Sequence, residues 1–152
     1  MDQTLVSILT GILIAGATSW ITVQLSLRQF RSQKWWEKKV DAYTRILNAL
    51  HQLKKSSNEH LEAEYRGRTV GEERAEELKE LSKKSREELK SAMDIGAFLL
   101  SDKAVKVLDE YESQIDNLDQ IESWFEYIDY LNAINQKTLK KIIPIARKDL
   151  KQ

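Results

Sequence analysis

Apolar residues follow two different patterns along the chain. The first is a continuous run, because Thr4 to Leu27 contains no charged residue over 24 positions. As a helix rising 1.5 Å per residue, this run would measure roughly 36 Å, and the hydrocarbon core of a bilayer is about 30 Å thick. The pattern therefore predicts a transmembrane helix over residues 1–27 and a separate domain over residues 28–152.

In the second pattern, apolar residues recur every three or four positions, which is typical of helices that bury one face. Its first stripe consists of Trp36, Val40, Tyr43, Leu47 and Leu50, with Ala42, Ile46, Ala49 and Leu53 beside it. No turn signal interrupts the chain before Arg66. We therefore expect the transmembrane helix to continue without a break into the domain.

Turn residues divide the rest of the domain into helices. The segment from Arg66 to Gly71 reads as the first turn, and Thr69 with Glu72 fits a capping box. We expect the next helix to run from about Val70 into the nineties.

Further along, Ser101 is predicted to cap a third helix that starts near Asp102, with a break at Asn117. Core spacing continues past the break through Phe125 and Ile128. The last amphipathic segment, Thr138 to Leu150, contains Pro144, which indicates two short pieces or one bent helix.

Because no segment alternates like a strand, the predicted class is all-α. We expect an N-terminal transmembrane helix that continues into a three- to four-helix cytoplasmic bundle.

A buried soluble helix and a signal peptide are the two alternatives to a membrane span. A buried helix of a soluble protein rarely has so long an uncharged run. A signal peptide would need a basic start, yet Asp2 is the only charged residue before the run and the basic residues follow it. The positions of the charges favour an anchor over both alternatives.

Basic residues set the expected orientation. Arg28, Arg31, Lys34, Lys38 and Lys39 follow the run, which predicts a single-pass protein with its N-terminus outside and its C-terminus cytoplasmic. Aromatic residues accompany them and are expected either at headgroup depth or at the start of the domain core. The predicted membrane-interface residues are Arg28, Phe30, Arg31, Lys34, Trp35 and Trp36.

Small residues recur every fourth position within the run, at Ser7, Gly11, Ala15 and Ser19. Such spacing lets two helix backbones approach closely in lipid. Chance is the competing explanation, since small residues are common in membrane helices. We expect this face to pack span against span in a homo-oligomer.

Charge and residue chemistry exclude several functions. Lys and Arg number 24, as do Asp and Glu, so the overall balance favours no nucleic-acid partner. The basic run from Arg28 to Lys55 is better explained by anionic lipid than by nucleic acid. The chain has no cysteine, and its two histidines are not spaced like metal ligands. We therefore predict no metal site, no cofactor and no catalytic residues. Asp94, inside the most apolar stretch of the domain, is the one candidate functional acid.

Three motifs resemble those of a group of small bacterial membrane proteins. They are the block Phe30-x-Ser32-x-Lys34-Trp35-Trp36-Glu37-x-Lys39-x-x-Ala42-Tyr43, the stretch Asp94 to Ser101, and the tail Pro144 to Leu150. The Trp-Trp-Glu sequence is the most specific of them. The resemblance implies a protein of the bacterial cell inner membrane, with one N-terminal span, a helical cytoplasmic domain and no assigned activity.

Two functional hypotheses follow. The first is a non-enzymatic, membrane-anchored interaction or scaffold module whose partners are the bilayer, other copies of the chain, and a protein or small ligand on the cytoplasmic domain. The second is a membrane-perturbing effector of the toxin or anti-phage type, whose cytoplasmic domain senses a ligand. A membrane-bound enzyme ranks third, because no motif for catalysis is present.

Overall fold

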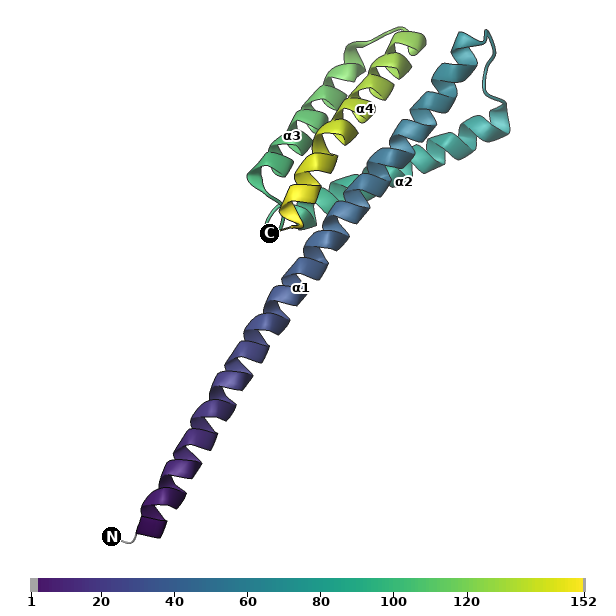
Figure 1. The fold of residues 1–152 in the computed structure, drawn as a ribbon. Helices are drawn as coiled ribbons and strands as arrows, with labels where there is room; N and C mark the ends of the chain where they lie inside the picture. The colour runs from purple at the N-terminus through teal and green to yellow at the C-terminus, as the bar shows by residue number, and fades with distance from the viewer. Residues whose placement is uncertain (1–2, 152) are drawn as a thin grey trace. The chain divides into compact units, whose positions relative to one another are not determined.

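The computed structural model describes the backbone of residues 3–151 and the side chains of residues 19–151. Its elements are α1 (Gln3–Tyr65), α2 (Glu72–Gly96), α3 (Asp102–Asp116), the 3-10 helix η1 (Asn117–Gln120) and α4 (Trp124–Asp149) (Figure 1). The described residues contain no strand, so the predicted all-α class is confirmed for them. The unbroken helix predicted up to Arg66 is also confirmed, because α1 has 63 residues.

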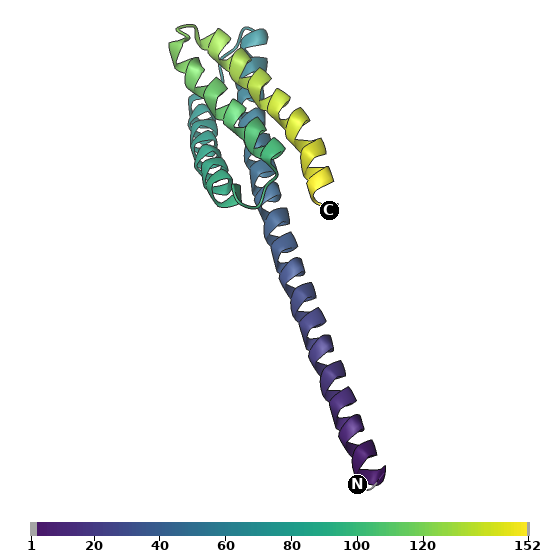
Figure 2. The same ribbon diagram turned by 90° about the vertical axis from the view of Figure 1, so that its left-hand side faces the viewer.

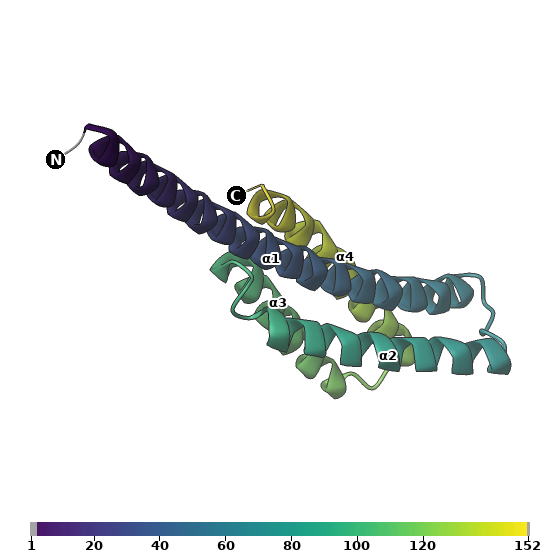
Figure 3. The same cartoon turned by 90° about the horizontal axis from the view of Figure 1, so that it is seen from below.

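The chain divides into two compact units, Met1–Glu37 and Lys38–Gln152. Within the second unit successive helices run in alternating directions, as Figures 1 and 2 show, which makes an antiparallel bundle of four helices. Seen from below, α2 and α4 lie on different sides of the bundle segment of α1 (Figure 3). The predicted three- to four-helix bundle is thereby confirmed.

The helices differ in how apolar they are, and only a long apolar helix can cross a membrane. In the part of the chain whose side chains are described, no helix has a stretch long and apolar enough to cross a membrane. Most of the predicted span, Thr4 to Leu27, lies outside that part.

The turn between α1 and α2 depends on one glycine. Gly67 adopts a φ of 61°, a left-handed conformation that side chains disfavour. The amide of Arg68 donates to the carbonyl of Ala63 at 2.9 Å, which closes the last turn of α1. The predicted capping box of Thr69 and Glu72 is wrong, because Gly71 occupies the N-cap of α2 and no side chain bonds there.

The predicted corner between α2 and α3 is confirmed. Ser101 is the N-cap of α3, and its Oγ accepts a hydrogen bond of 3.4 Å from the amide of Ala104. Gly96 and Leu100 are buried at this corner, whereas Phe98 is 66% exposed. The stretch therefore fills the core with only some of its apolar residues.

The predicted extent of the last helix is wrong, although the break at Asn117 is confirmed by η1. Helix α4 starts at Trp124, where Ser123 caps it, and runs without interruption through Pro144. Proline removes one backbone bond to the carbonyl four residues earlier, that of Lys140. Because Pro144 and Lys140 are both exposed, water can replace that bond and the helix continues.

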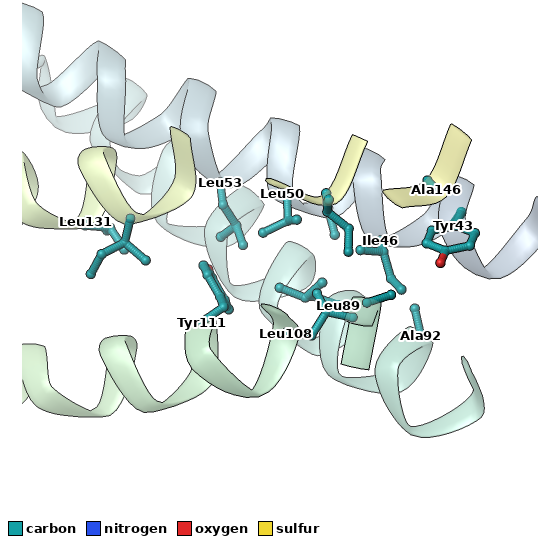
Figure 4. Close-up of a cluster of buried hydrophobic side chains, with 14 of the residues drawn as sticks. Tyr43, Ile46, Leu50, Leu53, Leu89, Ala92, Leu108, Tyr111, Leu131 and Ala146 are labelled. Carbon is teal, nitrogen blue, oxygen red and sulfur yellow. The ribbon is translucent and has the colours of Figure 1, made fainter. Parts of the chain in front are cut away.

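All four helices contribute to one hydrophobic core, part of which Figure 4 shows. Ile46 and Leu50 of α1 and Ile142 of α4 are completely buried, and Leu108 of α3 is 2% exposed. Burial of such side chains is worth about 1.5–3 kcal/mol each. The core therefore explains why these four helices remain together.

We predict that Leu108→Ala destabilises the bundle by about 2–5 kcal/mol, because it removes buried methyl groups and leaves a cavity. Lys106→Ala, an exposed change on the same helix, should alter stability by less than about 0.5 kcal/mol. Denaturant unfolding followed by circular dichroism measures both. Equal effects of the two variants would contradict the described packing of α3.

Candidate functional site

The predicted span-packing residues fall mostly outside the described side chains. This applies to Ser7, Gly11 and Ala15, whereas Ser19 is described and exposed. The large apolar residues that follow are also exposed, with values of 67% for Trp20, 54% for Ile21, 54% for Val23, 61% for Leu25 and 43% for Leu27. Their spacing in α1 places them on more than one side of the helix. The described part of the first unit therefore presents apolar surface to its surroundings.

The predicted membrane-interface residues Arg28, Phe30, Arg31, Lys34, Trp35 and Trp36 are all exposed. Lys34 pairs with Glu37 at 2.9 Å and lies 5.7 Å from the ring centre of Phe30. The hydrogen bond from Lys34 is the main reason that the pKa of Glu37 is lowered. The buried core begins only at Ala42, so these aromatic side chains take no part in it.

The structure places the candidate acid Asp94 on the exposed surface of the last turn of α2. Of its neighbours, Ala92, Gly96 and Leu100 are buried. A different carboxylate is buried in the bundle, that of Asp149, which is 8% exposed. The sequence pattern did not indicate that Asp149 is buried, because this residue follows basic residues near the end of the chain.

Asp149 joins three parts of the chain. Its carboxylate accepts a hydrogen bond from the hydroxyl of Tyr43 in α1 and another, of 3.3 Å, from the amide of Ser101. The Nζ of Lys39 donates to the main-chain oxygen of Asp149 at 3.3 Å. The end of α4 is thus fixed to the bundle segment of α1 and to the cap of α3.

These contacts change two pKa values. Burial by itself raises the pKa of Asp149, but hydrogen bonds from Ser101 and Tyr43 outweigh burial, so the pKa is lowered overall. Burial also raises the pKa of Tyr43, and the hydrogen bond to Asp149 raises it further. The carboxylate therefore stays charged and the phenol stays protonated at neutral pH, which is the arrangement that keeps their hydrogen bond.

An open cleft of about 830 Å³ lies between α1, α2 and α4. Its lining is Leu53, Ser56, Ser57, His60, Glu72, Ala75, Glu76, Lys79, Ser82, Lys83, Arg86, Glu87, Trp124, Tyr127, Ile128 and Leu131. The volume falls within the range of small-molecule pockets. Its lining combines apolar side chains with charged and hydroxyl-bearing ones.

Aromatic rings form one wall of the cleft. Trp124 and Tyr127 stack with ring centres 5.9 Å apart, and His60 meets Trp124 edge-on at 5.6 Å. Burial lowers the pKa of His60, although Glu59 and Glu64 oppose that shift. The imidazole is therefore neutral at physiological pH and suits apolar or aromatic contact.

The other polar groups of the cleft are arranged for structure. Ser56 donates to the carbonyl of Leu78 at 3.3 Å and accepts from Ser82 at 2.8 Å, which joins α1 to α2. Ser57 lies 3.1 Å from the Oδ1 of Asn132 in α4. Across the part of the chain that the structure describes, no group of three or more His, Asp or Glu side chains could hold a metal ion. The serines of the cleft are thus bonded to neighbouring helices.

Comparison with known proteins gives no further guide, because no family model, curated protein or solved structure matches the chain. The resemblance carried by the Trp-Trp-Glu sequence thus stays a prediction.

We predict that Asp149→Asn destabilises the bundle by about 1–3 kcal/mol at neutral pH, because the variant loses charge-assisted hydrogen bonds. Since the pKa of Asp149 is lowered on folding, the stability it contributes is complete above the unfolded pKa. That contribution disappears as pH falls through the folded pKa, below 3.8.

Unfolding free energies of both proteins, measured between neutral pH and acid, test this prediction. The difference between wild type and variant should shrink as the solution becomes acidic. A difference that stays constant with pH would show that the charge of Asp149 contributes nothing.

Proposed function

We propose that this chain is a membrane-anchored helical interaction module of the bacterial inner membrane, without catalytic activity, that self-associates through its membrane helices. One observation carries the anchor: the run from Thr4 to Leu27 has no charge over 24 residues. The apolar side chains from Trp20 to Leu27, exposed in the described part of α1, support it. Transfer of such side chains out of water is favourable, and lipid provides the apolar surroundings.

The basic residues that follow the run support an orientation with the bundle in the cytoplasm. Arg28, Arg31 and Lys34 lie within seven positions of Leu27. Cytoplasmic loops beside membrane helices are enriched in such residues. Phe30 and Trp35, each more than half exposed, are then suited to the headgroup layer.

Interaction rather than catalysis is the activity that the bundle supports best. The cleft between α1, α2 and α4 provides a binding surface with an aromatic wall. Its serines are already bonded to neighbouring helices, so they serve the packing of the bundle.

We predict that Gly11→Ile weakens self-association in bilayers about tenfold or more, because a branched side chain keeps two helix backbones apart. Leu13→Ile provides a matched control, since it lies roughly 200° around the helix from Gly11. Energy transfer between labelled chains in nanodiscs or vesicles measures both. If Leu13→Ile weakened self-association and Gly11→Ile did not, the result would contradict the proposed packing face.

The ligand-sensing effector is the second candidate, and the cleft is the observation that favours it. An effector should depolarise cells when it is overexpressed, and Gly11→Ile should abolish that effect because a pore requires several spans. Interaction modules should leave the membrane potential unchanged. A potential-sensitive dye in cells expressing each form distinguishes the two functions.

A further inference from the structure

One end of the bundle gathers three separate segments, and we name it the proximal end. It consists of residues 38–43 of α1, the corner at residues 95–101, and residues 147–151 at the end of α4. The hydrogen bonds of Asp149 to Tyr43 and Ser101 hold these segments together. The chain enters the bundle from the N-terminal unit at this end, through Lys38.

The corner at the proximal end exposes large apolar side chains. Ile95 is 49% exposed and Phe98 is 66% exposed. Gly96, which lies between them in sequence, is buried, and a Cβ placed on it would be 3.7 Å from the Cβ of Ala42. Because the backbone of the corner is packed against α1, these two side chains are held at the surface.

The other two segments of the proximal end carry exposed cations. Lys38, Arg147, Lys148 and Lys151 are exposed, while the carboxylate of Asp149 is turned into the bundle. Asp41 is the exposed acid within the three segments, and Asp94, Asp102 and Lys103 flank the corner, so cations remain in excess there.

The opposite end of the bundle has the reverse charge. Exposed carboxylates gather where η1 and α4 begin, at Asp116, Asp119, Glu122 and Glu126. This end also contains the edge-on contact of Tyr65 with Phe125, which places it at the far end of α1. Because α4 runs antiparallel to α1, its acidic first residues and its basic last residues lie at opposite ends of the bundle.

We propose that the proximal end rests on the membrane surface, where its lysines and arginine bind anionic lipid headgroups while Ile95 and Phe98 enter the interfacial layer. This inference rests on the membrane anchor of the proposed function. Ten residues, 28–37, separate the run from Lys38, and as a helix they span about 15 Å. Each basic residue near an anionic surface contributes about 1 kcal/mol, and apolar side chains partition into the interface beside them.

The absence of native cysteine makes a direct test available, because one introduced cysteine carries one label. A fluorophore on Ala97→Cys reports on the exposed corner and leaves Phe98 in place. Glu73→Cys, in the first turn of α2, reports on the opposite end, and Ile12→Cys reports on the anchor. The full chain is placed in nanodiscs of phosphatidylcholine with phosphatidylglycerol, in which some lipids have a nitroxide on the headgroup or in the acyl chain.

We expect headgroup nitroxide to quench the label at residue 97 several-fold more than the label at residue 73. Nanodiscs of phosphatidylcholine alone should reduce that difference, because they lack the anionic lipid. Reversal of charge with Lys148→Glu and Lys151→Glu should reduce it too. The matched control pair, Lys137→Glu and Lys140→Glu, lies exposed earlier in α4 and should leave quenching unchanged.

The anchor label separates the two ways in which the inference can fail. If acyl-chain nitroxide quenches the label at residue 12 but headgroup nitroxide quenches residues 97 and 73 equally, the anchor stands and the docking surface is overturned. If residue 12 is not quenched, the anchor itself is refuted and the docking surface falls with it. If quenching at residue 97 were strong but did not change without anionic lipid or after charge reversal, the proposed role of the lysines would be overturned.

Discussion

The need to remove apolar surface from water dominates this chain, and it acts differently in its two units. In the bundle, Ile46, Leu50 and Ile142 are completely buried because four helices share one core. In the first unit, Trp20 and Leu25 remain more than 60% exposed. A large apolar side chain left in water forgoes about 1.5–3 kcal/mol, so burial of these side chains against apolar surroundings would be favourable. Our proposal assigns that role to lipid.

A buried carboxylate joins three segments of the bundle where the chain enters it. Asp149 bonds to Tyr43 and Ser101, which are distant in sequence, and fixes the end of α4 beside the start of the bundle segment of α1. This closure also decides where charge lies, because an antiparallel α4 brings its basic C-terminal residues to the proximal end and leaves its acidic start at the other. The buried carboxylate therefore lies at the end of the bundle whose basic residues the lipid inference depends on.

Local patterns in the sequence predicted much of the fold, because helix periodicity and the cap at Ser101 are properties of neighbouring residues. The capping box at Thr69 failed, since Gly71 starts α2 without any side-chain bond. Pro144 was expected to shorten or bend the last helix, yet an exposed proline can be accommodated when water replaces the missing bond. The site residues were harder to predict. Asp149 and the cleft beside Trp124 depend on contacts between distant helices, which no local pattern contains, and Asp94 misled because apolar neighbours in sequence do not ensure burial.

The membrane anchor is tested most directly by fractionation of cells that express the full chain. Membranes collected without detergent are washed in alkaline carbonate, which releases proteins held only by charge or by contact with other proteins. We predict that the chain stays in the membrane pellet after this wash and leaves it only when detergent is added. Recovery of full-length, folded chain in the detergent-free supernatant would contradict the account.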